Sequence, residues 1–206
     1  SGTEAWTLLV ENASASVSHS TLTASEWYPI YILGRESLVT LTENVLDGNL
    51  HDRIRLGANA MMGHDTVLTP QVVWDGYELE ATLTVPPTVT LTLEPGVIIK
   101  TAAYPYDMGL VVQGKLEAVG TSGLPITLTS TDGTPAWAGV VVDGGRANLA
   151  YTTVEYGCSD SRKSNIAVIN GGRLEMADSL LRECHYGGGA GEEMLVVDNN
   201  LASIRS

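Results

Sequence analysis

The stretch Val140-Val141-Val142-Asp143-Gly144-Gly145 runs an apolar, β-branched triplet into a polar turn, and the phrase decides the fold because it recurs. Comparable phrases are Leu8-Leu9-Val10-Glu11-Asn12, Leu110-Val111-Val112-Gln113-Gly114, Ala167-Val168-Ile169-Asn170-Gly171-Gly172 and Leu195-Val196-Val197-Asp198-Asn199-Asn200. The turn residues of the last four copies lie at 113, 143, 170 and 198, so the steps are 30, 27 and 28 residues. A repeat of this length is typical of a solenoid, in which each copy forms one coil of a stack.

The rest of the chain alternates apolar and polar residues with a period of two, which is typical of half-buried strands. Valine and threonine fill these segments, as expected for a pleated sheet surface. The clearest examples are residues 17–22, 39–45, 83–93, 126–129 and 149–154. No segment keeps apolar residues at three- and four-residue spacing for a dozen residues. The sequence therefore predicts an all-β chain.

The repeats also predict the direction of the strands. Residues 15–22 match residues 39–46 at an offset of 24. Such recurrence is expected of parallel coils that lie in register, whereas a sandwich or barrel would show short hairpin turns between strands. About eight coils stacked about 4.8 Å apart would form a rod about 35 to 40 Å long.

The segment 51–78 lacks the repeated phrasing. It carries two arginines, two methionines, two histidines and a proline. We interpret it as an irregular junction between coils at 1–50 and coils at 79–206. The junction is either a loop excursion from one continuous rod or a break between two half-rods, and the sequence leaves both open.

Composition and charge exclude several classes of partner. The 206 residues carry a formal net charge of −13 and no phenylalanine. An acidic chain is a poor ligand for nucleic acid, which requires a basic surface, and for anionic membranes. No run of 18 apolar residues is present, so no membrane insertion is expected. The charge would also repel acidic polysaccharides unless a cation bridged them.

The two cysteines, Cys158 and Cys184, are separated by 26 residues, close to one coil. Stacked coils could bring them within bonding distance. The local alignment sets the period at 27, however, which places Cys158 opposite His185. A disulfide and two free thiols therefore both remain open.

A resemblance to a known family is carried by five segments: residues 83–100 (LTVPPTVTLTLEPGVIIK), 112–121 (VQGKLEAVGT), 125–130 (PITLTS), 137–142 (WAGVVV) and 149–156 (LAYTTVEY). This part of the chain resembles the right-handed parallel β-helix repeat proteins of bacterial surfaces, the non-lyase branch of the pectate-lyase-like superfold. The resemblance implies an all-β, right-handed parallel β-helix.

In such proteins the phrase at 83–100 opens a β-helix, and coils rich in asparagine and serine follow it. Here the coils of that asparagine- and serine-rich kind, at 8–50, come first. The chain therefore resembles the tail of one unit joined to the head of the next, cut from a tandem array in a larger secreted or cell-surface protein. The resemblance thus implies an extracellular or cell-surface location.

Catalysis in the lyases and hydrolases of this superfold would require several acidic side chains that converge on one outward face. The nearest candidates are Glu155, Glu175, Asp178 and Asp198. They do not recur as a set at coil spacing, so we interpret them as solvating surface acids and predict no catalytic residues and no enzyme activity.

Metal and cofactor sites are not expected either. The histidines are isolated and lack metal-ligand spacing; they are His19, His51, His64 and His185. A polar column is predicted at one corner of successive coils, formed by Glu11, Gln113, Asp143, Asn170 and Asp198. Asparagine and aspartate suit such turns, so the column is interpreted as structural. It could contribute some oxygen ligands to calcium, which requires six to eight.

Aromatic residues at turn-like positions are the remaining candidates for a binding site. We expect exposed, glycan-facing rings at Trp27, Tyr28, Tyr104, Tyr106 and Trp137. The alternative is that these rings cover coil corners or pack in loops.

The sequence thus predicts a non-catalytic structural or adhesive module, with a polysaccharide-binding or polysaccharide-cleaving domain as the alternative. The expected partners are a glycan or cell-surface ligand and, through unpaired end strands, another copy of the chain stacked end to end.

Overall fold

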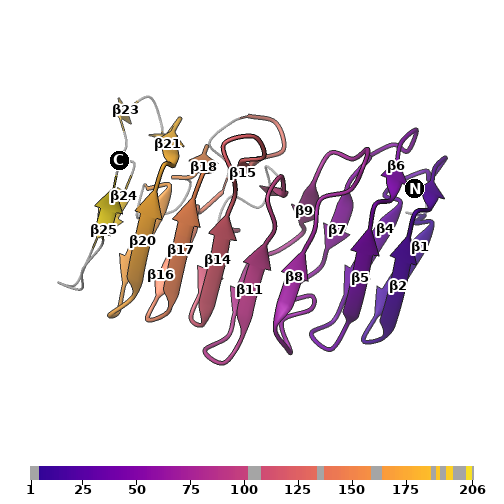
Figure 1. Ribbon diagram of the computed structural model, residues 1–206, viewed down its shortest axis with the longest axis horizontal. Helices are drawn as coiled ribbons and strands as arrows, with labels where there is room; N and C mark the ends of the chain where they lie inside the picture. Colours follow the sequence, from indigo (N-terminus) through magenta and orange to yellow (C-terminus); the bar gives the residue numbers. More distant parts are fainter. Residues whose placement is uncertain are drawn as a thin grey trace.

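The chain folds as a parallel β-solenoid, which confirms the predicted fold class (Figure 1). The computed structural model describes residues 5–101, 108–133, 137–158, 164–186, 189–190, 194–196 and 203–205. Within these residues there is no helix, and hence none that could cross a membrane. The solenoid makes about six turns, slightly fewer than the number expected.

Sheet 1 is the longest sheet and contains eight parallel strands. In spatial order these are β1 (Leu8–Glu11), β4 (Ile30–Leu33), β7 (Ile54–Leu56), β9 (Tyr77–Leu79), β12 (Ile98–Thr101), β15 (Ile126–Ser130), β18 (Thr152–Glu155) and β21 (Leu180–Arg182).

Two further parallel sheets complete the coils from β8 onward. Sheet 2 contains β10 (Leu83–Val85), β13 (Leu110–Val112), β16 (Val140–Asp143), β19 (Ile166–Ile169) and β24 (Met194–Val196). Sheet 3 contains β8 (Thr66–Leu68), β11 (Thr90–Leu93), β14 (Lys115–Val119), β17 (Arg146–Ala150), β20 (Arg173–Ala177) and β25 (Ser203–Arg205).

At the N-terminal end the coils are completed by two short parallel pairs. These are β2 (Ser14–Ser18) with β5 (Leu38–Thr42), and β3 (Thr21–Leu22) with β6 (Val45–Leu46). Ala15 pairs with Val39, and Leu22 with Leu46, which confirms the offset of 24. Near the other end β22 (His185–Tyr186) and β23 (Gly189–Ala190) pair antiparallel, unlike the other strand pairs of the described residues.

The core consists of aliphatic columns that run along the solenoid. In sheet 3, Leu91, Leu116, Ala147 and Leu174 succeed one another in register, and each is at most 3% exposed. Burying a leucine-sized side chain contributes about 1.5–3 kcal/mol. Because every coil packs on its neighbours in this way, stability accumulates along the stack.

The corner between sheets 2 and 3 is tightly packed and contains a column of glycines. A Cβ added to Gly145 would lie 2.5 Å from the carbonyl oxygen of Val112 on the preceding coil, and one added to Gly172 would lie 2.4 Å from that of Val142. These are backbone atoms that cannot give way. The sequence must therefore place glycine here on successive coils.

Part of the predicted polar column is found at this corner. Asp143 accepts hydrogen bonds from Gln113 Nε2 (3.4 Å) and Asn170 Nδ2 (2.6 Å), so three coils are linked by side chains. The prediction is wrong for Glu11, which ends β1 in sheet 1 and lies on another side of the solenoid. Asp198 lies outside the described residues.

The segment 51–78 does not break the rod. Its strands β7 and β9 pair with each other and with β4 and β12, so sheet 1 passes through it without interruption. The irregularity lies on the opposite side, where β8 pairs with β11 but not with β5. Side chains bridge that gap, since Thr69 Oγ1 donates to Leu41 O (2.6 Å) and Gln71 Oε1 accepts from Asn44 Nδ2 (2.9 Å).

A disulfide joins Cys158 and Cys184, whose Cα atoms are 5.6 Å apart. Of the two alternatives left open by the sequence, the bonded form is therefore observed. The bond links the ends of two successive coils just beyond β18 and β21 of sheet 1.

Candidate functional site

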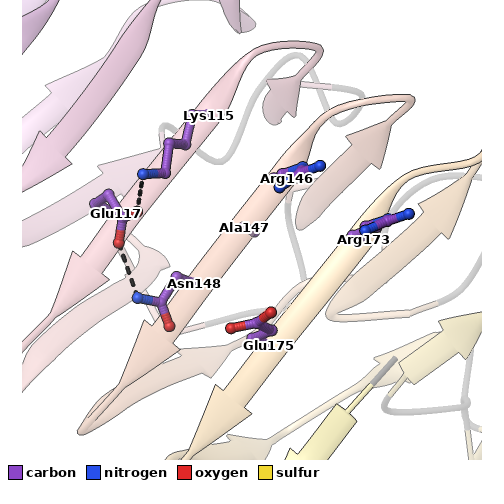
Figure 2. A pocket seen from close by; sticks show the side chains of 7 residues that line it. All are labelled: Lys115, Glu117, Arg146, Ala147, Asn148, Arg173 and Glu175. Atoms are coloured by element: carbon purple, nitrogen blue, oxygen red, sulfur yellow. Dashed lines mark hydrogen bonds and ion pairs between the residues drawn. The ribbon is translucent and has the colours of Figure 1, made fainter. Parts of the chain in front are cut away.

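The outer face of sheet 3 carries two columns of polar side chains (Figure 2). The first column is basic, because Lys115, Arg146 and Arg173 occupy paired positions on β14, β17 and β20. The second, two residues further along the strands, consists of Glu117, Asn148 and Glu175. We call the two columns together the sheet 3 face. They border a shallow groove of about 230 Å³.

The polar groups of this face are only partly satisfied. Lys115 Nζ lies 2.6 Å from Glu117 Oε1, and Asn148 Nδ2 donates to Glu117 Oε2 (2.8 Å). Within the part of the chain that the structure describes, no partner is found for the side chains of Arg146, Arg173 or Glu175. The face can therefore offer two guanidinium groups and one carboxylate to another molecule.

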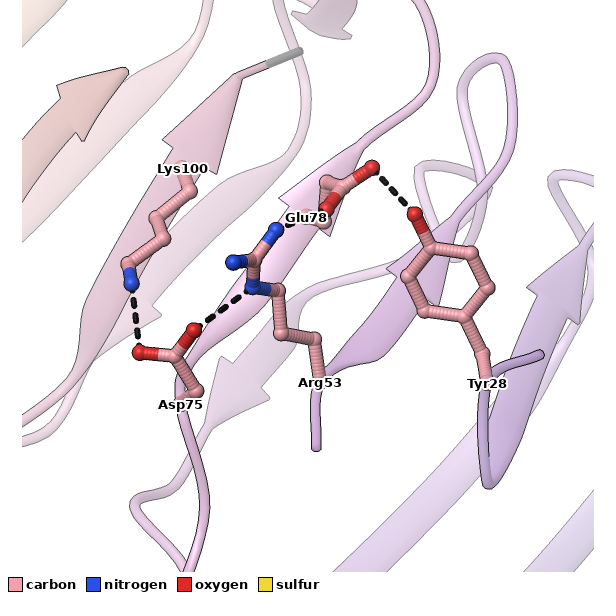
Figure 3. Close-up of polar contacts among 5 residues, drawn as sticks. All are labelled: Tyr28, Arg53, Asp75, Glu78 and Lys100. Carbon is pink, nitrogen blue, oxygen red and sulfur yellow. Dashed lines mark hydrogen bonds and ion pairs between the residues drawn. The ribbon is translucent and has the colours of Figure 1, made fainter. Parts of the chain in front are cut away.

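A different arrangement occupies the outer face of sheet 1 (Figure 3). Strand alternation turns Tyr77 and its in-register neighbours Ile54 and Ile99 inward, so the residues between inward positions, such as Glu78 and Lys100, point outward. We call Arg53, Asp75, Glu78 and Lys100 the charged cluster.

The members of the charged cluster hold one another across three coils. Arg53 Nε lies 2.7 Å from Asp75 Oδ2, and Arg53 Nη1 lies 2.7 Å from Glu78 Oε2. Lys100 Nζ pairs with the other oxygen of Asp75. Tyr28 Oη, from a fourth coil, donates to Glu78 Oε1 at 2.6 Å. Glu78 itself is only 4% exposed.

A second set of contacts extends the cluster toward the N-terminal end. Arg55 Nη2 lies 3.2 Å from Glu80 Oε1, and Tyr31 Oη donates to the other oxygen of Glu80. The Arg55 guanidinium also lies 4.9 Å from the centre of the Tyr28 ring, in the range of a cation–π contact.

The surroundings shift two pKa values in opposite directions. Burial, reinforced by the hydrogen bond to Glu78, raises the pKa of the Tyr28 hydroxyl, so Tyr28 remains a neutral donor. Burial alone would raise the pKa of Asp75, but hydrogen bonds from Lys100 and Arg53 lower it below its ordinary value. Asp75 is therefore ionised wherever the protein is folded at neutral pH.

Together these contacts form a self-neutralised network. Three basic groups, from Arg53, Arg55 and Lys100, meet three carboxylates, from Asp75, Glu78 and Glu80. Both oxygens of Glu78 are already occupied. The network thus holds neighbouring coils together, and each of its three carboxylates has a basic partner.

The acidic residues named from the sequence do not come together. Glu155 lies on sheet 1, where it accepts a hydrogen bond from Thr129 (3.0 Å) and pairs with Arg182 (2.6 Å). Glu175 lies on sheet 3, and Asp178 follows the same strand at the next turn. Asp198 is outside the described residues. Among the residues described, no three acidic, histidine or cysteine side chains form a group that could hold a metal ion.

The expectation of exposed, glycan-facing aromatics is wrong for two of its residues. Trp137 is 1% exposed and donates from Nε1 to the carbonyl oxygen of Glu155 (2.9 Å), so its ring is part of the core. Tyr28 is 3% exposed and belongs to the contacts around the charged cluster. Trp27 is half-buried and packs edge-on against His51, so a glycan contact there stays a prediction. Tyr104 and Tyr106 lie outside the described residues.

Sequence reasoning missed the charged cluster, although a signal was present. Arg53 and Arg55 are separated by one residue, as are Glu78 and Glu80, and the two pairs are offset by 25 residues. That offset is one coil. Charged residues of opposite sign at coil spacing would have predicted ion pairs between neighbouring strands.

Comparisons with known proteins agree with this architecture. Residues 62–180 match the family described as pectate-lyase like beta helix domain. The search of curated proteins and the search of solved structures give no match. The matched segment covers more than half of the chain and includes the strands of the sheet 3 face. The chain therefore belongs to the pectate-lyase-like β-helix domain family.

Proposed function

We propose that the chain is a non-catalytic structural or adhesive module of a larger secreted or cell-surface bacterial protein. The observation that carries this proposal is the uninterrupted pairing of sheet 1 across all eight strands, including the irregular segment. A stack in which every coil contacts its neighbours behaves as one stiff element. A stiff element of this kind suits a spacer that holds other domains away from a surface.

Two further features support the proposal. The charged cluster reinforces the rod where the coil pattern is least regular, because it ties together the coils that contain β7, β9 and β12. The disulfide favours an oxidising compartment, as expected of a secreted or surface protein.

The spacer role is tested by placing the chain between two fluorescent proteins and measuring the distribution of energy transfer in single molecules. A stiff rod gives a narrow distribution that does not change between low and high salt. The Glu78→Gln variant, which weakens the charged cluster, should broaden it. A broad, salt-dependent distribution for the unmodified chain would contradict the proposal.

The competing function, favoured by the family description, is the binding or cleavage of polysaccharides. It is tested by incubating the chain with a panel of pectins and glycosaminoglycans in the presence of calcium. We expect no ultraviolet absorbance from the conjugated double bond of an unsaturated product and no loss of viscosity, with a heat-denatured sample as the control. Product formation would replace the structural proposal with an enzymatic one.

End-to-end stacking with another copy is part of the same proposal. Within the described residues, the outer edges of β1, β2 and β3 pair with no other strand. Unpaired edges favour the addition of further strands. We expect concentration-dependent particles whose longest dimension is doubled in small-angle scattering; a chain that keeps its monomer length at every concentration would contradict this.

A further inference from the structure

On the sheet 3 face, two neighbouring arginines lie side by side without a carboxylate partner among the described residues. Arg146 and Arg173 occupy directly paired positions on neighbouring strands, about 4.8 Å apart along the solenoid. Like charges in directly opposed positions destabilise a sheet. Lys115 is neutralised by Glu117, but no carboxylate of the described residues contacts either guanidinium.

This arrangement is unusual within the chain. The protein has 11 lysines and arginines against 24 acidic residues. In the described part of the chain, ion pairs engage Arg53, Arg55, Lys100, Lys115 and Arg182. Two neighbouring arginines without a counter-ion, in a strongly acidic protein, indicate that the opposing charge comes from outside the coil.

The second column supplies such a charge when the face meets a copy of itself. The columns run parallel to the solenoid axis and are two residues apart, about 7 Å along the strands. A two-fold axis that runs along the solenoid, midway between the columns, exchanges them. The basic column of one copy then faces the acidic and amide column of the other.

We propose that a second copy of this chain packs side by side on the sheet 3 face, with both rods pointing in the same direction. Each symmetric contact is then made twice. Lys115 faces Glu117 of the second copy, and Arg173 faces Glu175. Arg146 faces the Asn148 amide oxygen, which accepts its hydrogen bonds.

The opposite direction is excluded by the same charges. A two-fold axis that runs along the strands would place Arg146 on Arg146 and, centred on β17, Lys115 on Arg173. All three basic contacts would then be repulsive. The order of the columns thus selects the parallel pair of rods.

The shape of the face is compatible with close approach. Threonines at positions 90 and 92 and half-buried alanines at positions 150 and 177 flank the columns, and the groove of about 230 Å³ can receive the long basic side chains of the second copy. The three strands of this face and the adjoining β11 together present about 300 Å² in projection, from strand spacing and rise. An interface of this size belongs to the weak class, and copies held together on one surface would raise its occupancy.

The experiment is sedimentation velocity on the full chain from about 10 μM to about 1 mM, a range that detects weak dimers. Arg173→Glu and Glu175→Arg each place like charges opposite one another, so each should weaken dimerisation by about tenfold or more. The double variant Arg173→Glu/Glu175→Arg restores complementary columns and should dimerise within about threefold of the unmodified chain. Arg35 is an exposed residue at the turn after β4, and Arg35→Glu, which changes the net charge as Arg173→Glu does, should have no comparable effect.

Small-angle scattering distinguishes this dimer from end-to-end stacking, because side-by-side rods keep the length of the monomer and double its width. Thermal unfolding of each variant checks that the fold is intact. A chain that stays monomeric at about 1 mM, or a double variant that stays as weak as the single variants, would overturn the proposal. So would a monomer that binds polyglutamate through Arg146 and Arg173.

Discussion

Replacing Glu78 by glutamine is the sharpest test of the charged cluster. The substitution keeps the shape of the side chain and removes its charge. In the native protein the Glu78 carboxylate accepts from Arg53 Nη1 at 2.7 Å and from Tyr28 Oη at 2.6 Å, and it is 4% exposed. The variant therefore leaves Arg53 with Asp75 as its remaining ionic partner.

The expected loss of stability follows from the burial of the Arg53–Glu78 ion pair. Breaking a buried ion pair by removing one partner costs about 3–5 kcal/mol. The Arg53 side chain is 18% exposed and keeps its contact with Asp75, so the lower end applies. We expect the free energy of unfolding to fall by about 3 kcal/mol. For a chain of this size the midpoint temperature should fall by about 6–12 °C.

The assay is urea-induced unfolding followed by far-ultraviolet circular dichroism, with a thermal scan as a second measurement. Glu80→Gln is the matched control, because Glu80 is 37% exposed and its contact with Arg55 is longer, at 3.2 Å. An exposed pair contributes about 1 kcal/mol or less. A double-mutant cycle with Arg53→Met isolates the coupling between Arg53 and Glu78, expected at about 1.5 kcal/mol or more.

The reasoning fails if Glu78→Gln costs no more than Glu80→Gln, or if the cycle gives no coupling. Either result would mean that the cluster is a solvated set of surface charges. The rod would then owe its continuity at this coil to backbone pairing and the aliphatic core alone.

Three further predictions concern the disulfide, the dependence of the protein's stability on pH, and the glycine corner between sheets 2 and 3. Replacing Cys158 and Cys184 together by serine should lower the free energy of unfolding by about 3.5 kcal/mol, from the loop entropy of 26 residues; equal urea midpoints for the oxidised and reduced native protein would contradict this. Because the pKa of Asp75 is lowered in the folded state, its contribution is present above the unfolded value of 3.8 and is lost as the pH falls below it. Thermal scans between about pH 2 and 5 should therefore show a steeper loss for the native protein than for Asp75→Asn. Gly145→Ala should cost about 1–3 kcal/mol in urea unfolding, because the added Cβ meets backbone of the preceding coil, whereas Gly123→Ala, with open space around it, should be neutral; equal midpoints would contradict the packing argument.

The fold could be predicted because the repeating phrase reports interactions between neighbouring coils. Each apolar triplet must lie on the triplet before it to bury its side chains, so the spacing of the phrases gives both the strand direction and most of the register. The same reasoning misplaced Glu11. Its phrase has the composition of a sheet 2 strand, but the first coil places it in sheet 1, next to β4. Composition alone does not state on which side of the solenoid a strand begins.

The candidate sites were harder to predict because they depend on contacts between different faces and corners. An aromatic residue beside a turn can point toward solvent or fold inward, and Trp137 folds inward, where its indole N–H donates a hydrogen bond to the backbone carbonyl oxygen of Glu155. For a related reason, the 27-residue strand period did not predict the disulfide. Both Cys158 and Glu183 have positive φ values, of 83° and 57°, so the chain turns at each corner and the sulfurs meet although the strand register alone would not align them.

The three corners of a coil differ in how much chain they can accept. Between sheets 2 and 3 the connection is very short: β16 ends at Asp143 and β17 begins at Arg146, and the glycine there has no space for even a methyl group. Between sheets 1 and 2 the connection is several times longer, since β15 ends at Ser130 and β16 begins at Val140, and β18 ends at Glu155 and β19 begins at Ile166. Foreign peptides inserted into these longer connections on successive coils would leave from sheet 1 strands about 4.8 Å apart, so that epitopes or enzymes could be arrayed at a fixed interval, provided that the insertion keeps the buried Trp137 and the disulfide at Cys158 in place.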